Sequence, residues 1–149
     1  MPHDFKKFPE LTWNQMNFYY NSSPHKQIVD DFTAKVVRVK DGDTLQLRWS
    51  ERDFDFPLRM IPNASPELKE VGGIASQKWL EQRVLNQEVD ITIDPNNRIE
   101  KWGRLLGRVM LEGIDIGEES IITGHGIGFE EFAFGNIPSF EGELNAFKL

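Results

Sequence analysis

The chain of 149 residues contains no cysteine. This absence excludes disulfide bonds and thiolate metal sites and leaves the redox compartment open. The sequence also lacks an apolar run of roughly 18 residues, so we expect no membrane-spanning helix. Its first residues, MPHDFKKFPEL, contain no apolar signal core. Unless a signal has already been removed, we expect the protein to lie in the cytoplasm or within a larger assembly.

An excess of basic residues is missing as well. Residues 1–111 contain 16 acidic and 16 basic side chains, whereas residues 112–149 contain eight acidic residues and only Lys148 as a base. The whole net charge of −7 therefore lies in the last quarter. Proteins that bind nucleic acids along an extended surface usually neutralise phosphates with clustered lysine and arginine. The charge distribution argues against such a surface but allows a small pocket that binds one phosphate.

Residues 32–67 predict three short strands, because apolar residues recur at every second position or nearly so. The residues that carry this pattern are Val36, Val37 and Val39, then Leu45, Leu47 and Trp49, then Phe56, Leu58 and Met60. Between the first two strands we expect a tight turn, Asp41-Gly42-Asp43-Thr44, whose glycine permits a positive φ.

The remaining pattern predicts a small barrel. Helical spacing favours a helix at about 74–85, alternation favours strands at 88–93 and 105–111, and a short helix is expected at about 117–123. Five strands with a helix between the third and fourth match the connectivity of an OB-type barrel. The predicted fold class is therefore α+β, mainly β, with a short C-terminal helix.

Two extensions flank this pattern. In residues 1–31, Thr12 and Gln15 fit a capping box that begins a short helix ending near Tyr20. Its aromatic side chains face nearly all directions, so it either packs on its own barrel or binds a partner protein. Residues 129–149 alternate phenylalanines with acids and predict an extended tail along a surface, its own or another protein's.

Four short motifs occur in a characteristic order. They are Asp41-Gly42-Asp43-Thr44, Arg59, Ser65-Pro66-Glu67 and Lys101-Trp102-Gly103-Arg104. In order and spacing, residues 32–128 resemble the staphylococcal nuclease (thermonuclease-like) family. The resemblance implies the same OB-type barrel and Ca²⁺-dependent endonuclease activity, the hydrolysis of phosphodiester bonds in DNA or RNA.

The resemblance also implies a role for each site residue. Glu67 would be the general base, and Arg59 and Arg104 would bind the phosphate through their guanidinium forks. The implied calcium-binding residues are Asp43 through its carboxylate, Ser65 through its backbone carbonyl and, acting indirectly, Asp41.

One metal-binding position departs from the family pattern. Where the family has a ligating aspartate, this chain has Ala64. The adjacent Asn63 is a poor substitute, because a continued strand pleat turns it to the opposite face. Ca²⁺ affinity increases with the number of charged ligands, so we expect weak calcium binding.

The tail contains a second departure. Phe132 and Phe134 fall at the spacing of two aromatic residues that line the family's nucleotide pocket, so they are candidates for base stacking. Glu130 and Glu131 stand beside them, and these anions are unfavourable near a phosphate. The alternative is that both phenylalanines anchor the tail by packing.

Two hypotheses follow. The first is a Ca²⁺-dependent nuclease with weakened metal binding. The second is a catalytically degenerate module of the same fold with a structural or binding role in a larger assembly, such as a viral particle. In the second case, residues 1–31 and 129–149 would bind the protein partners.

Overall fold

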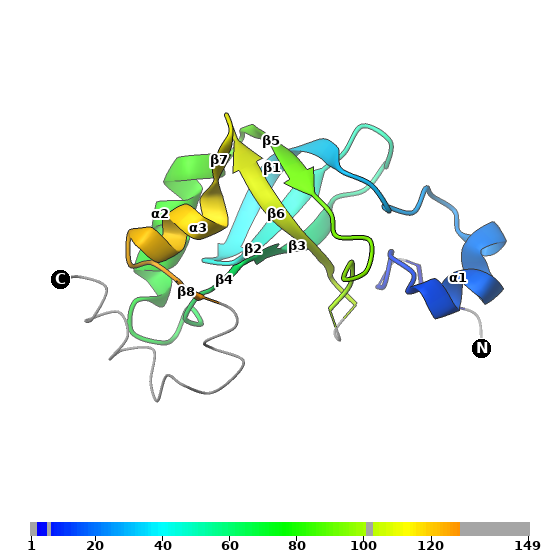
Figure 1. Cartoon of the computed structure of the whole chain (residues 1–149), viewed down its shortest axis with the longest axis horizontal. Helices are drawn as coiled ribbons and strands as arrows, with labels where there is room; N and C mark the ends of the chain where they lie inside the picture. The colour runs from blue at the N-terminus through cyan, green and yellow to red at the C-terminus, as the bar shows by residue number, and fades with distance from the viewer. Residues whose placement is uncertain (1–2, 6, 101–102, 129–149) are drawn as a thin grey trace.

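A computed structural model describes residues 3–5, 7–100 and 103–128. Its centre is a closed barrel of five strands (Figure 1). These strands are β1 (Phe32–Asp41), β2 (Thr44–Arg48), β3 (Phe56–Ile61), β5 (Glu88–Thr92) and β6 (Leu105–Leu111). Neighbours pair in the order β3-β2-β1-β5-β6, and a parallel pairing of β3 with β6 closes the ring. The predicted OB-type architecture is confirmed.

Alternation along the strands fills the barrel. Every second residue of β5 is buried, as a half-exposed strand requires, and β2 follows the same alternation from Leu45 onward, after the buried Thr44. Strand β1 departs from strict alternation, since its pairing with β2 shifts register after Val36 and again after Val39. These irregularities let both valines face the core although they are three residues apart.

Two helices lie at one end of the barrel. Helix α2 (Gly73–Val84) follows the third strand and packs on β1, burying Leu80 and Val84. Helix α3 (Ile116–Ile122) begins after Asp115, whose carboxylate accepts a hydrogen bond from the Glu118 amide. Both helices were predicted within two residues of their bounds. None of the helices in the described ranges is long and apolar enough to cross a membrane.

Three very short strands were not predicted. Strand β7 (Ile114–Asp115) folds back on β6, and β4 (Asn63–Ala64) pairs with β8 (Ile127–Gly128). A pair of two-residue strands carries too little sequence pattern to detect. The β4–β8 pair fixes the segment that leads into Ser65 and Glu67, two of the residues predicted for the site.

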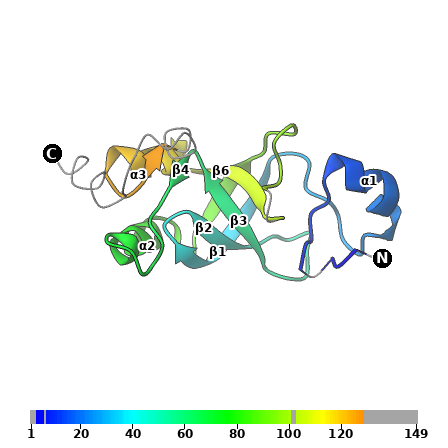
Figure 2. The same ribbon diagram turned by 90° about the horizontal axis from the view of Figure 1, so that it is seen from below.

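Helix α1 (Trp13–Tyr19) lies at the opposite end of the barrel from α2 and α3 (Figures 1 and 2). The predicted capping box is present, and a 3₁₀ turn, Tyr20–Ser22, follows the helix. None of its side chains is buried, and Phe18 is 80% exposed. One contact with the barrel is a hydrogen bond of 2.7 Å from the Trp13 indole to the Pro95 carbonyl.

The segment around α1 is nevertheless anchored firmly to the barrel. Glu10 is buried and pairs with Arg52 at 2.6 Å and with Arg98 at 3.3 Å. The Arg98 guanidinium also donates to the backbone carbonyls of Leu11 and Ile28. A buried carboxylate between two arginines therefore joins both ends of the extension to the barrel, while α1 projects from it.

Candidate active site

The site begins at the turn between β1 and β2. The Asp41 carboxylate accepts a hydrogen bond of 3.0 Å from the Asp43 amide. Gly42 does not adopt the positive φ that glycine permits. The turn needs glycine for space: a Cβ there would lie 2.0 Å from Ser76 Oγ and 2.6 Å from Ser65 Cβ. Close packing therefore holds the backbone between the two aspartates.

Asp43 and Arg59 form the inner part of the site. Arg59 Nη2 lies 3.3 Å from Asp43 Oδ2, and their side chains are only 9% and 13% exposed. Arg59 Nη1 also donates to the backbone carbonyls of Met60 and Asn63, the latter at 2.9 Å. Bound on both sides, this guanidinium orients Asp43.

The environment of Asp43 disfavours its charged form. Burial, together with the neighbouring Asp41, raises the pKa of this carboxyl to about 7 against the opposing effects of Arg59 and the Ser65 amide. The carboxylate accepts a hydrogen bond of 3.0 Å from the Ser65 amide and one of 3.1 Å from the Thr44 hydroxyl. Near neutral pH, Asp43 is therefore poised between two protonation states.

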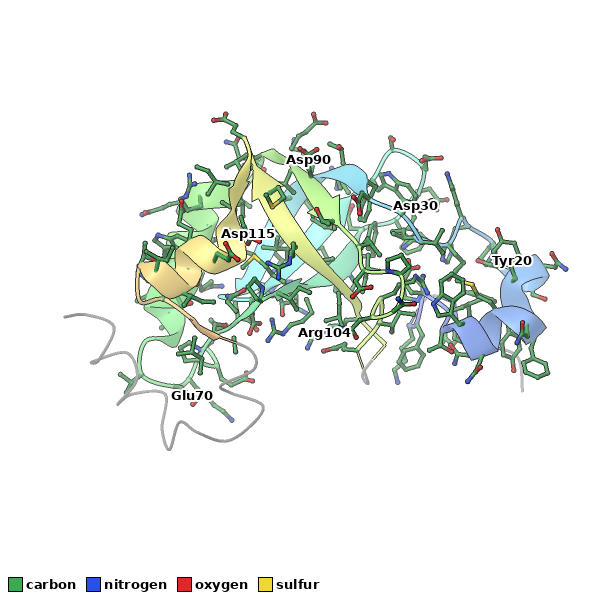
Figure 3. The ribbon with its side chains drawn as sticks, in the orientation of Figure 1. Tyr20, Asp30, Glu70, Asp90, Arg104 and Asp115 are labelled. Carbon is green, nitrogen blue, oxygen red and sulfur yellow. The ribbon has the colours of Figure 1, made fainter. Side chains whose placement is uncertain are left out.

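Arg104 lies just before β6 and forms the outer part of the site (Figure 3). Its guanidinium binds both carboxylate oxygens of Glu100 and donates to the Thr44 hydroxyl at 3.0 Å. The hydrogen bonds that Arg104 donates to the Glu100 carboxylate raise the pKa of Arg104. Its side chain remains 32% exposed, so this is the arginine that a ligand can reach.

Barrel closure explains why these residues meet. Arg59 pairs with Thr44 across β2–β3 and with Leu106 across the parallel β3–β6 pairing. Arg104 precedes Leu106 by two residues, so three strands bring both arginines to one barrel end. The Thr44 hydroxyl, between Arg104 and Asp43, links the outer and inner parts.

The predicted segment Ser65–Glu67 reaches the site through Ser65. Its amide binds Asp43, but the Glu67 side chain is exposed. Glu67 and Glu70 form a closed turn in which each amide bonds to the other residue, with distances of 2.9 Å. In the described part of the chain, no hydrogen bond or ion pair joins the Glu67 carboxylate to Asp43, Arg59 or Arg104. Phe132 and Phe134 lie outside the described residues.

Sequence reasoning missed three residues of this site. Thr44 belonged to the recognised turn motif but received no role, and Glu100 gave a detectable signal only as an acid four residues before Arg104. Asn63 was considered only as a poor metal ligand. It is fully buried, with its side-chain amide 3.2 Å from the Gly42 carbonyl.

A calcium ion requires about six to eight oxygen ligands. Among residues 3–5, 7–100 and 103–128, no group of three or more histidine, cysteine, aspartate or glutamate side chains could hold a metal ion. Both carboxylate oxygens of Asp43 already accept hydrogen bonds, and the position expected to supply a second direct carboxylate is the buried Ala64. The residues present therefore do not fit a complete calcium site.

Comparison with known proteins shows a low-identity similarity of this chain to proteins named as endonucleases. No protein-family model matches the sequence. Two curated relatives, from Escherichia coli O157:H7 and Escherichia coli, are both named "Uncharacterized endonuclease". Each is 27% identical over 103 residues, which cover 68% of this chain and 64% of the relative. The chain thus spans less than two thirds of their length.

Proposed function

We propose that this protein is a nuclease that hydrolyses phosphodiester bonds in DNA or RNA. The observation that carries the proposal is the convergence of Asp43, Arg59 and Arg104 at one end of the barrel. The similarity to two proteins named as endonucleases supports the same reaction class.

Arg104 is the phosphate-binding group in this proposal. Its fork already holds a planar anion, the Glu100 carboxylate, with two hydrogen bonds. A phosphate of the nucleic acid would compete with Glu100 for the same donors. Arg59 is less accessible and acts by holding Asp43 and the backbone around it.

Glu67 is the general base in this proposal, because its exposed carboxylate is open to water. It removes a proton from water while the water oxygen forms a bond to phosphorus. The bond from phosphorus to the leaving sugar oxygen breaks, and this oxygen takes a proton from solvent. The guanidinium of Arg104 stabilises the charge that develops on the phosphoryl oxygens.

Calcium dependence rests only on the resemblance to the staphylococcal nuclease family, and the ligands described above do not form a complete calcium site. No step of the reaction is therefore assigned to the metal. If calcium participates, its affinity is low, and Ala64→Asp would strengthen it by adding the missing carboxylate.

The test is cleavage of single-stranded DNA and of RNA by the purified protein, with millimolar Ca²⁺ and with a chelator. Glu67→Gln should abolish cleavage, because the amide accepts no proton. Glu70→Gln is the matched control: it removes a charge from the same turn but keeps an oxygen for the Glu67 amide. Cleavage that survives Glu67→Gln would contradict the assigned base.

One observation favours the alternative role as a binding module. Helix α1 contains no charged residue and buries no side chain, while Trp13, Phe18 and Tyr20 are each more than half exposed. Such a face suits an apolar protein partner. If the folded protein and its Ala64→Asp variant both fail to cleave nucleic acid with calcium, the binding role replaces the nuclease proposal.

A further inference from the structure

The side chain of Asn63 lies behind the turn that carries Asp41 and Asp43. It is fully buried, and its Nδ2 lies 3.2 Å from the Gly42 carbonyl oxygen. Only a donor can face a carbonyl oxygen favourably, so this contact fixes which end of the Asn63 amide points to the turn. The turn is therefore bound at its central residue by a side chain from another strand.

The backbone of Asn63 reaches the other half of the inner site. Its carbonyl accepts a hydrogen bond of 2.9 Å from Arg59, which in turn pairs with Asp43. Two residues further on, the Ser65 amide donates to Asp43. Strand β4 and the residue that follows it thus contact the turn, the arginine and the carboxylate.

Two neighbouring glycines lie so close to Asn63 that a larger residue at either position would crowd it. A Cβ on Gly117 would lie 3.1 Å from Asn63 Oδ1, and one on Gly126 would lie 3.3 Å from Asn63 Cβ. Gly117 is the second residue of helix α3, and Gly126 directly precedes β8, which pairs with β4. The elements that follow the barrel therefore pack their backbone closely against the asparagine.

We propose that Asn63 is a positioning residue that fixes the Asp41–Asp43 turn relative to Arg59. Its relevance to catalysis rests on the proposed nuclease function, whereas its effect on the turn does not. Because one side-chain hydrogen bond ties Gly42 to the rest of the site, removing it should let the turn open without unfolding the barrel.

Native-state hydrogen exchange, measured by NMR without substrate, tests this directly. The Asp43 amide reports on the turn, since it bonds to Asp41, and the Val36 amide, bonded to the Gln87 carbonyl, reports on the barrel. In Asn63→Leu, exchange at Asp43 should rise at least about fivefold relative to Val36, the effect of losing a hydrogen bond of about 1 kcal/mol. If Asn63 only stabilised the fold as a whole, its replacement would raise the exchange rates of both amides by the same factor.

Ser76→Ala is the matched control. Ser76 is also buried beside Gly42, but its hydroxyl donates to the His125 carbonyl instead of to the turn. The ratio of the two exchange rates should stay unchanged in this variant. An unchanged ratio in Asn63→Leu, or an equal rise in both variants, would overturn the proposal.

Two further measurements keep the proposal testable. If Asn63→Leu does not fold, NMR of the Asn63 side-chain amide in the wild type tests the contact. Slow hydrogen exchange of this amide and a scalar coupling to the Gly42 carbonyl carbon support the hydrogen bond, and unprotected exchange refutes it.

If the wild type cleaves nucleic acid, Asn63→Leu should lower kcat about tenfold with little change in KM, because Arg104 does not contact Asn63. If the wild type does not cleave, the nuclease proposal fails and the exchange data still decide the role of Asn63.

Discussion

Replacing Asp43 by asparagine should make the protein more stable at alkaline pH, although the change removes an ion pair. The native structure holds this carboxyl in a buried place beside Asp41, where the charged form is unfavourable. Asparagine keeps an oxygen for the Ser65 amide and carries no charge. Arg59 keeps its two backbone carbonyl partners.

The size of the effect follows from the pKa of Asp43, about 7 in the folded chain against an ordinary value of 3.8. The folded state binds this proton more tightly than the unfolded state, so its contribution to stability is full below pH 3.8 and is lost as the pH rises to about 7. At about 1.4 kcal/mol per pKa unit, the whole loss is about 4 kcal/mol. About 2.5 kcal/mol of this falls between pH 5 and pH 8.

The assay is urea denaturation of the wild type and of Asp43→Asn at pH 5 and pH 8. The free energy of unfolding of the wild type should fall about 2.5 kcal/mol more than that of the variant over this interval. Titrating groups that do not interact with Asp43 contribute equally to both proteins and cancel in the difference. Asp90→Asn is the control, because Asp90 is exposed and bonds only a threonine hydroxyl among its described contacts.

Equal pH dependence in wild type and Asp43→Asn would refute the reasoning. It would mean that Arg59 and the Ser65 amide hold the carboxyl near its ordinary pKa despite its burial. A variant that is less stable than the wild type at pH 8 would contradict it more strongly, since the ion pair would then outweigh the cost of burying the charge.

Three other changes have defined outcomes. Glu10→Ala should lower the free energy of unfolding by about 3–5 kcal/mol in urea, because it leaves Arg52 and Arg98 buried without their anion. Gly42→Ala should cost about 1–3 kcal/mol in the same assay, since its methyl group meets Ser76 and neighbouring side chains. Phe18→Ser should change stability by less than about 0.5 kcal/mol, because the ring is exposed, and a calorimetric melt with a clearly lower Tm would show that α1 packs in solution.

The barrel could be predicted because its strands alternate in burial. In β2, Leu45 and Leu47 face the core, and this period of two is visible without any structure. The capping box at Thr12 and Gln15 was equally readable, since its signal is local. The buried ion pairs of Glu10 with Arg52 and Arg98 could not be predicted, because an acidic side chain is normally solvated and these partners are distant in sequence.

The sequence identified which residues lie together in the candidate site better than it identified how they are arranged there. The motifs identified Asp43, Arg59 and Arg104, and the structure brings all three to one end of the barrel. That Arg59 is buried and Arg104 accessible depends on how β3 and β6 pair, which no local pattern encodes. The role of Asn63 depends on a pairing of only two residues, β4 with β8. Whether Glu67, Ser65 and calcium act as expected stays a prediction.

The parallel pairing of β3 with β6 also sets when the site can exist during synthesis. Arg59 belongs to the third strand, but its neighbour across the closure is Leu106. A ribosome adding roughly 5–20 residues per second needs several seconds to pass from one strand to the other, and β6 must then leave the exit tunnel. Until that moment Arg104 cannot reach the Thr44 hydroxyl beside Asp43, so a nascent chain that ends before β6 lacks the outer part of the proposed site.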